Sequence, residues 1–95
     1  MPSPFLDQRV VIPPTVLFRE LGGEAVLLNF ESERYYGLDS VGTRIWEALA
    51  AGATLREGYT RLLAEYDVEP ALLLADIQNL LRDLSAQGLV VMEAA

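Results

Sequence analysis

The fold of this chain is decided by one stretch, Arg34-Tyr35-Tyr36-Gly37-Leu38-Asp39-Ser40, which runs directly into Val41-Gly42-Thr43-Arg44-Ile45-Trp46. Its first part is aromatic and suits a β-strand, whereas Asp39 or Ser40 can cap a helix by accepting hydrogen bonds from free amide groups. The pattern is strand-like before this stretch and helical after it, until the last few residues. The sequence therefore predicts a small sheet whose last strand meets the first helix with almost no loop.

Two strand-like runs precede the stretch, at residues 15–21 and 24–31, and only Gly22-Gly23 separates them. A two-residue glycine connection between β-branched and aromatic runs predicts a β-hairpin. The second run is apolar at nearly every position, which is typical of a central strand covered on both faces. Ser32-Glu33 then predicts a tight turn into a third strand, residues 34–38. We expect a three-stranded antiparallel meander with the third strand at its edge.

Three helices are expected downstream, and each has its own boundary signals. These are Gly52 after the first helix, Thr54 and Glu57 as a capping box for the second, Pro70 at the start of the third and Gln87-Gly88 at its end. Gly58 lies inside the second helix, where glycine costs about 1 kcal/mol relative to alanine, so it predicts close packing against another helix. The order of elements indicates an α+β domain, with the helices segregated from a small sheet.

The third helix carries too many apolar residues for one narrow stripe. It should bury two adjoining faces, or bury one and offer the other to a partner. After it, residues 89–92 are suited to a short terminal strand. At the other end, all prolines except Pro70 lie within residues 1–14, which predicts an extended N-terminal arm at 1–13 and a single domain at 14–92. The apolar run 10–12 in the arm favours packing on the domain over a docking role.

Composition excludes most classes of chemistry. The chain has no histidine and no cysteine, so the usual general base, thiolate nucleophiles and the commonest metal ligands are missing, and we expect no metal and no cofactor. The net charge of −7, with arginine as the only basic residue, opposes binding to nucleic acid and to anionic membranes. No run is long enough to span a membrane and no signal pattern opens the chain, which predicts a cytoplasmic protein.

The residues that would have to support catalysis or nucleic-acid binding do not favour either function. Asp76 and Asp83 share a helix face but lie two turns apart, too far for a tight acid–base pair, and solvated acids are the simpler interpretation. The glycines form neither of the common phosphate-loop patterns. A sheet with three helices is also compatible with a winged-helix DNA-binding domain, but the third helix has more acidic than basic residues. A small enzyme and a DNA-binding protein remain the alternatives from other classes.

Tyr35 and Tyr36 are the residues that point to a binding role. Neighbours in a strand face opposite sides, so at most one of the two can be buried in the inner layer of the sheet. The other faces solvent or a partner, beside backbone groups that an edge strand leaves unpaired. An exposed edge with flanking side chains is the geometry of strand addition, in which a peptide extends the sheet. Plain core packing of the tyrosines is the alternative.

The chain resembles the PqqD-like family over residues 14–91. The resemblance is carried by Phe18–Asn29, by Tyr35–Trp46, and by shorter matches at Tyr66-Asp67-Val68, Ala75-Asp76-Ile77, Leu80–Leu84 and Gly88-Leu89-Val90. Glu69 before Pro70, and Asp39, depart from the residues commonest in the family. The resemblance implies a winged helix-turn-helix-like domain without catalytic activity. Such a domain is a recognition element for precursors of ribosomally synthesised, modified peptides.

The resemblance also implies a ligand and a site. Members of the family bind the leader of a precursor peptide as an additional antiparallel strand on the third strand, with leader side chains entering a groove beside the third helix. Carried over to this sequence, the implied peptide-binding residues are Arg34, Tyr35, Tyr36, Gly37 and Leu38 on the edge, with Leu74, Asp76, Ile77, Gln78 and Leu81 on the helix.

Two pathways are implied by the resemblance. In lasso-peptide biosynthesis, a stand-alone protein of this kind presents the leader to a separate leader peptidase and a cyclase. In pyrroloquinoline quinone biosynthesis, the counterpart is a peptide chaperone that works with a radical SAM enzyme. The similarity to stand-alone members favours the lasso setting. The oligomeric state, the precursor and the enzyme surface contacted are left open by the sequence.

Overall fold

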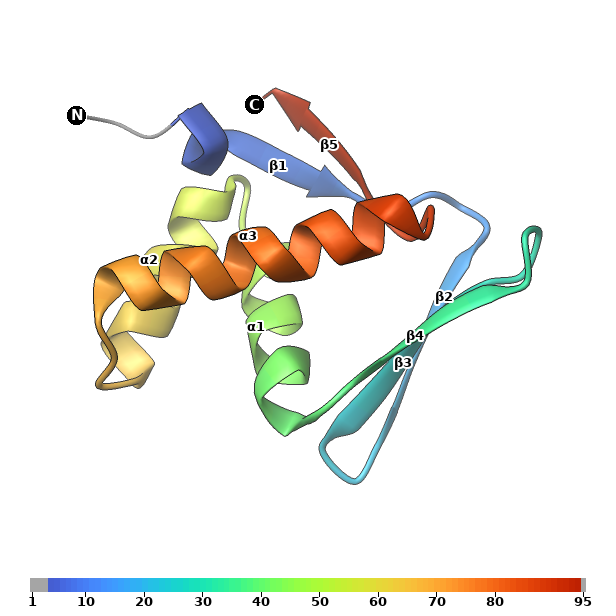
Figure 1. Cartoon of the computed structure of the whole chain (residues 1–95), viewed down its shortest axis with the longest axis horizontal. Coiled ribbons are helices and arrows are strands. Elements are labelled where there is room, and N and C mark those ends of the chain that lie inside the picture. Colours follow the sequence, from blue (N-terminus) through green and yellow to red (C-terminus); the bar gives the residue numbers. More distant parts are fainter. Residues whose placement is uncertain (1–3, 95) are drawn as a thin grey trace.

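A three-stranded antiparallel sheet is followed by three helices in the computed structural model, which describes residues 4–94 (Figure 1). This confirms the predicted α+β arrangement. The elements in chain order are η1 (Pro4–Asp7), β1 (Gln8–Val11), β2 (Val16–Leu21), β3 (Glu24–Asn29), β4 (Arg34–Leu38), α1 (Ser40–Ala51), α2 (Leu55–Glu65), α3 (Pro70–Ala86) and β5 (Val91–Ala94). None of the helices described is long and apolar enough to cross a membrane.

The sheet has the strand order β2-β3-β4, so β4 is an edge as expected, and β2 is the other edge. The hairpin between β2 and β3 turns at Gly22 and Gly23, whose φ angles of 62° and 85° are accessible to glycine without strain. Leu21 pairs with Glu24 across this turn, and the antiparallel register then continues without interruption to the far end of both strands.

Only one face of this sheet is covered. Ala25, Leu27 and Leu38 point inward and are buried, while Val26 on the opposite face is 42% exposed. The expectation that the central strand would be covered on both faces was therefore wrong. All the helices lie on the inner side of the sheet (Figure 1), so the apolar side chains on its outer face are exposed. The apolar run alone does not show this.

The first two helices pack closely through Gly58. A Cβ atom at this position would lie 2.8 Å from the carbonyl oxygen of Ala48 in α1, which explains the glycine inside α2. The helix caps also follow the sequence signals. The Asp39 side chain accepts a 2.7 Å bond from the amide of Gly42, and the Thr54 hydroxyl accepts one of 3.4 Å from the amide of Glu57.

The third helix buries one face and exposes another. Its core residues are Leu73, Ile77, Leu81 and Leu84. Leu72 is 60% exposed although it is adjacent to this row. Of the two arrangements that the sequence allowed, this is the one in which a face of the helix is free for a partner.

The two ends of the chain pair with each other. β1 and β5 form a separate antiparallel sheet in which Val10 lies opposite Met92, and Arg9 and Glu93 form a 3.9 Å ion pair across it. Residues 8–11 of the predicted arm are thus hydrogen-bonded to the end of the chain, and Leu6 just before them is buried in the core. Residues 1–3 of the arm lie outside the described residues. The division at residue 13 stays a prediction.

Candidate functional site

The open edge of β4 presents its backbone groups at alternate residues. The amide of Phe30 donates to the carbonyl of Thr15 at 3.0 Å, which makes this pair a hydrogen-bonded one, and such pairs alternate along an antiparallel ladder. By this alternation, the even-numbered residues of β3 bond to β2 and its odd-numbered residues bond to β4. The β4 partners of these odd-numbered residues are the even-numbered residues of β4. The amide and carbonyl groups of Tyr35 and Gly37 therefore point away from the sheet, where another strand could bond to them.

The two tyrosines on this edge face opposite sides, as expected. Tyr35 lies on the outer face and is 70% exposed. Tyr36 lies on the inner face beside Leu27 and is partly buried against the core. Its phenol donates a 3.3 Å hydrogen bond to Oδ2 of Asp83 in α3. Burial, and then the nearby Asp83 carboxylate, raise the pKa of the Tyr36 phenol above its ordinary value.

Further polar contacts tie the same end of the sheet to the end of α3. Nη1 of Arg34 donates to Oε1 of Gln87 at 2.9 Å, and Nδ2 of Asn29 donates to the carbonyl of Gly88 at 3.1 Å. Together with the Tyr36 bond, they fix how α3 lies along β4. The strand and the helix run in opposite directions, so the start of α3 lies toward the end of β4 that leads into α1 (Figure 1).

These contacts identify the side of α3 that faces β4. Asp83 and Gln87 both bond to β4 side chains, and an α-helix turns by about 100° per residue, so residues at steps of three or four from them share that side. We call this row the α3 strip; it consists of Leu72, Asp76, Leu80, Asp83 and Gln87.

Most of the helix residues implied by the resemblance lie off this strip. Ile77 and Leu81 are 0% and 1% exposed, so they lie in the core beneath the strip and a ligand cannot contact them directly. Leu74 and Gln78 are turned by about 160–200° from Asp76 and lie on the far flank of the helix. Asp76 alone of the implied helix residues is on the α3 strip. Leu72, Leu80, Asp83 and Gln87 share the strip with Asp76 and were not among the implied residues, although their spacing from Asp76 was a usable signal.

An apolar hollow lies where the α3 strip begins. It has a volume of about 230 Å³ and is lined by Val41, Ile45, Tyr66, Val68, Leu72, Leu73 and Asp76. Because Val41 and Ile45 come from the start of α1, directly after β4, the hollow lies beside the end of the open edge. Asp76 is the only charged residue in its lining. We call it the α1–α3 hollow.

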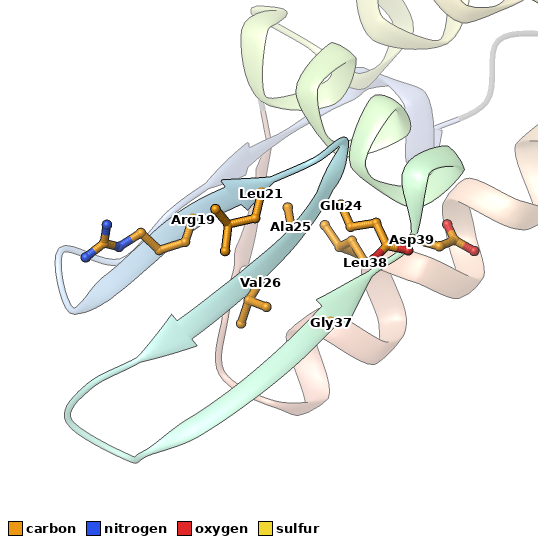
Figure 2. A pocket seen from close by; sticks show the side chains of 8 residues that line it. All are labelled: Arg19, Leu21, Glu24, Ala25, Val26, Gly37, Leu38 and Asp39. Carbon is orange, nitrogen blue, oxygen red and sulfur yellow. The ribbon is translucent and has the colours of Figure 1, made fainter.

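A second, more open hollow lies on the outer face of the sheet (Figure 2), with a volume of about 480 Å³. Val26 and Gly37 are opposite each other in the register. Because glycine has no side chain, the surface is recessed at Gly37 on the edge of the sheet. Arg19 and Leu21 border it on the side of β2, and Glu24 borders it at the start of β3. This surface was not predicted, because the outer face of the sheet was expected to be covered.

The features of β4 and its surroundings are suited to binding a partner. No group of three or more potential metal-ligating side chains occurs within residues 4–94. Asp76 and Asp83 stay two turns apart on α3, and Asp83 is engaged by Tyr36. What β4 offers is a row of free backbone groups with an exposed apolar face on one side and the α3 strip on the other.

Comparisons with known proteins identify solved structures and a family to which this chain is similar. Two solved structures have the same fold. One, described as "TbiB1 in Complex with the TbiA(beta) Leader Peptide", is 34% identical with a TM-score of 0.75, covering 83% of this chain and 92% of that one. The other, "Lasso peptide synthetase B1 complexed with the leader peptide", is 24% identical with a TM-score of 0.76, covering 87% and 98%. No curated protein matches the sequence. Residues 24–90 match the family described as "Coenzyme PQQ synthesis protein D (PqqD)", and the chain belongs to this family.

Proposed function

We propose that this protein binds the leader of a ribosomal precursor peptide and presents it to modifying enzymes. The single observation that carries the proposal is the open edge of β4, where the backbone groups of Tyr35 and Gly37 are directed away from the sheet. A peptide in extended form can pair with these groups, and its side chains then gain specificity from the surfaces on either side. Both solved structures similar to this chain are described as complexes with a leader peptide.

The proposed binding site combines the edge with the α3 strip. Arg34 to Leu38 provide the pairing strand, and the leader residues that face inward lie against Leu72, Asp76, Leu80 and Asp83. Ile77 and Leu81 hold this wall in place from the core. Leu74 and Gln78, which the family resemblance implies, belong to the site only if α3 rotates on binding.

The proposed role is that of a carrier without a chemical step of its own. Its expected partners are the leader peptidase and the cyclase of a lasso-peptide pathway, since one of the similar solved structures is described as a lasso peptide synthetase. A chaperone of pyrroloquinoline quinone biosynthesis is the second candidate, favoured by the family that matches residues 24–90. In both roles the domain at residues 14–92 would act in the cytoplasm.

The α3 strip argues against the DNA-binding alternative. Its charged residues are Asp76 and Asp83, so the side of α3 that faces the open edge would repel phosphates. The remaining surface does not compensate, because the chain as a whole carries a net charge of −7. A salt-sensitive shift of duplex DNA by this protein would contradict the proposal.

Fluorescence anisotropy tests the proposal with two labelled peptides. One is the TbiA(beta) leader, and the other is the leader segment of any short precursor found to be encoded next to the gene for this protein. We expect at least one of them to bind with a Kd tighter than about 100 μM, as strand addition with side-chain contacts allows. If neither peptide binds to the folded protein, the proposed function is wrong.

A matched pair of variants shows whether binding uses the edge. Gly37→Pro removes an amide that points to the open side and places a ring there, while leaving the hydrogen bonds to β3 in place. Gly37→Ala adds only a methyl group in open space, because nothing lies within 4 Å of its Cβ position. Binding should fall at least about tenfold in the proline variant and stay within about twofold of wild type in the alanine variant.

A further inference from the structure

The α1–α3 hollow combines an apolar wall with the carboxylate of Asp76. The Asp76 side chain makes no hydrogen bond or ion pair with another residue in the part of the chain that the structure describes. Its neighbour on the α3 strip, Asp83, differs because it accepts the hydrogen bond of Tyr36. The rest of the lining is apolar or aromatic, and no basic side chain contributes to it.

The position of the hollow relates it to one part of a bound peptide. β4 ends at Leu38 and α1 begins at Ser40, so Val41 and Ile45 place the hollow beside the C-terminal end of the edge strand. A peptide that pairs antiparallel with β4 runs in the opposite direction. Its residues N-terminal to the paired segment therefore reach the hollow. This step rests on the function proposed above.

We propose that the α1–α3 hollow binds a lysine or arginine side chain of the leader, from the segment N-terminal to the strand that pairs with β4. The methylene stem lies against Val41, Leu72 and Val68, and the cationic end reaches the carboxylate of Asp76. Long basic side chains bind in this way because their stems are apolar and only their ends are charged. The ring of Tyr66 in the same lining also attracts a cation.

Electrostatics favours this occupant over a purely apolar side chain. A leucine would fill the hollow, but it would remove water from Asp76 without providing a partner for the charge, which opposes binding. A basic side chain fills the apolar space and pairs with the carboxylate. The loop before α3 strengthens the preference, since Asp67 and Glu69 are exposed there and add negative charge close to the hollow.

Selection from a display library of random peptides tests the inference without assuming a ligand. The immobilised wild-type protein is the bait, and Gly37→Pro serves for counterselection so that only peptides paired with the edge are retained. The retained peptides should share a lysine or arginine at a fixed distance before their paired segment. The same selection on Asp76→Asn should lose this preference, whereas Glu20→Gln, an equal charge change on β2 away from the hollow, should keep it.

Binding of one selected peptide then gives the size of the effect. Replacing its basic residue by norleucine keeps the stem and removes the charge, and should weaken binding to wild type about tenfold. The same replacement should change binding to Asp76→Asn by less than about twofold. Retained peptides without a basic residue in that segment, or equal losses on both proteins, overturn this inference and leave the proposed function intact. If no peptide is retained, the proposed function itself fails.

Discussion

The phenol of Tyr36 donates a 3.3 Å hydrogen bond to the carboxylate of Asp83, and so joins the open edge of the sheet to the third helix. The bond lies toward one end of the α3 strip, next to the contact between Arg34 and Gln87. At the other end, Asp76 has no equivalent partner among the described residues. The strip is therefore fixed to the sheet at one end and open to a ligand at the other.

Removing the Tyr36 hydroxyl tests whether this bond positions the helix. We expect Tyr36→Phe to lower the free energy of unfolding by about 1 kcal/mol and to weaken peptide binding by less than about tenfold, because the ring stays in place. Urea unfolding and anisotropy with the TbiA(beta) or neighbouring leader would measure both. Tyr35→Phe is the matched control and should leave stability unchanged. A larger loss of stability in the control would contradict this assignment.

The pH dependence of stability follows from the raised pKa of Tyr36. The unfolded phenol loses its proton at its ordinary pKa of about 10, before the folded one does, so the folded protein binds more protons and loses stability as the pH rises above that value. Tyr36→Phe should reduce this alkaline loss. Asp83→Asn should lower the pKa of Tyr36 only in part, since burial is the larger cause. Phenolate absorbance and unfolding at several alkaline pH values would measure these effects.

Substitution of Ile77 should mainly affect stability, whereas substitution of Leu72 should mainly affect peptide binding. Ile77 is completely buried, so Ile77→Ala should lower the free energy of unfolding by about 2–5 kcal/mol. Leu72 is largely exposed beside the α1–α3 hollow, so Leu72→Ala should change stability by less than about 1 kcal/mol and weaken peptide binding. Denaturant titrations and anisotropy on both variants provide the comparison. A folded Leu72→Ala variant with unchanged affinity would remove this residue from the site.

Gly58 should not tolerate a side chain. An alanine would favour the helix by about 1 kcal/mol, but its Cβ would meet the backbone of α1 at 2.8 Å from the Ala48 oxygen. We expect Gly58→Ala to be destabilising by about 1–3 kcal/mol in thermal or urea unfolding. Gly37→Ala, which meets open space, is the control and should be close to neutral. A more stable Gly58→Ala protein would show that the two helices can separate at little cost.

Much of the fold could be predicted because local signals agree with it. The Gly22-Gly23 hairpin, the Asp39 cap and Pro70 at the start of α3 each have a short-range physical cause. The pairing of β1 with β5 could not be predicted, since it joins residues at opposite ends of the chain. The exposure of Val26 was missed for a related reason: an apolar strand does not reveal which of its faces the helices will cover.

In the candidate site, the sequence shows how the side chains of the strand are directed, but it does not show how the helix is turned. The position of Tyr35 and Tyr36 on opposite faces follows from the two-residue period of a strand. On α3, apolar residues occur on several sides, so their pattern alone does not show which row meets the sheet. The bonds of Asp83 and Gln87 to β4 settle this, and they depend on how the helix is rotated in the packed fold.

The pairing of Gln8 with Ala94 has a consequence for how this domain can be combined with others. The start of β1 and the end of β5 lie side by side, and only the short helix η1 comes between β1 and the part of the chain before it (Figure 1). A domain with neighbouring ends can be inserted into a surface loop of a host protein through two short connections. The open edge of β4 belongs to the other sheet, so an inserted copy would keep that edge accessible to a peptide.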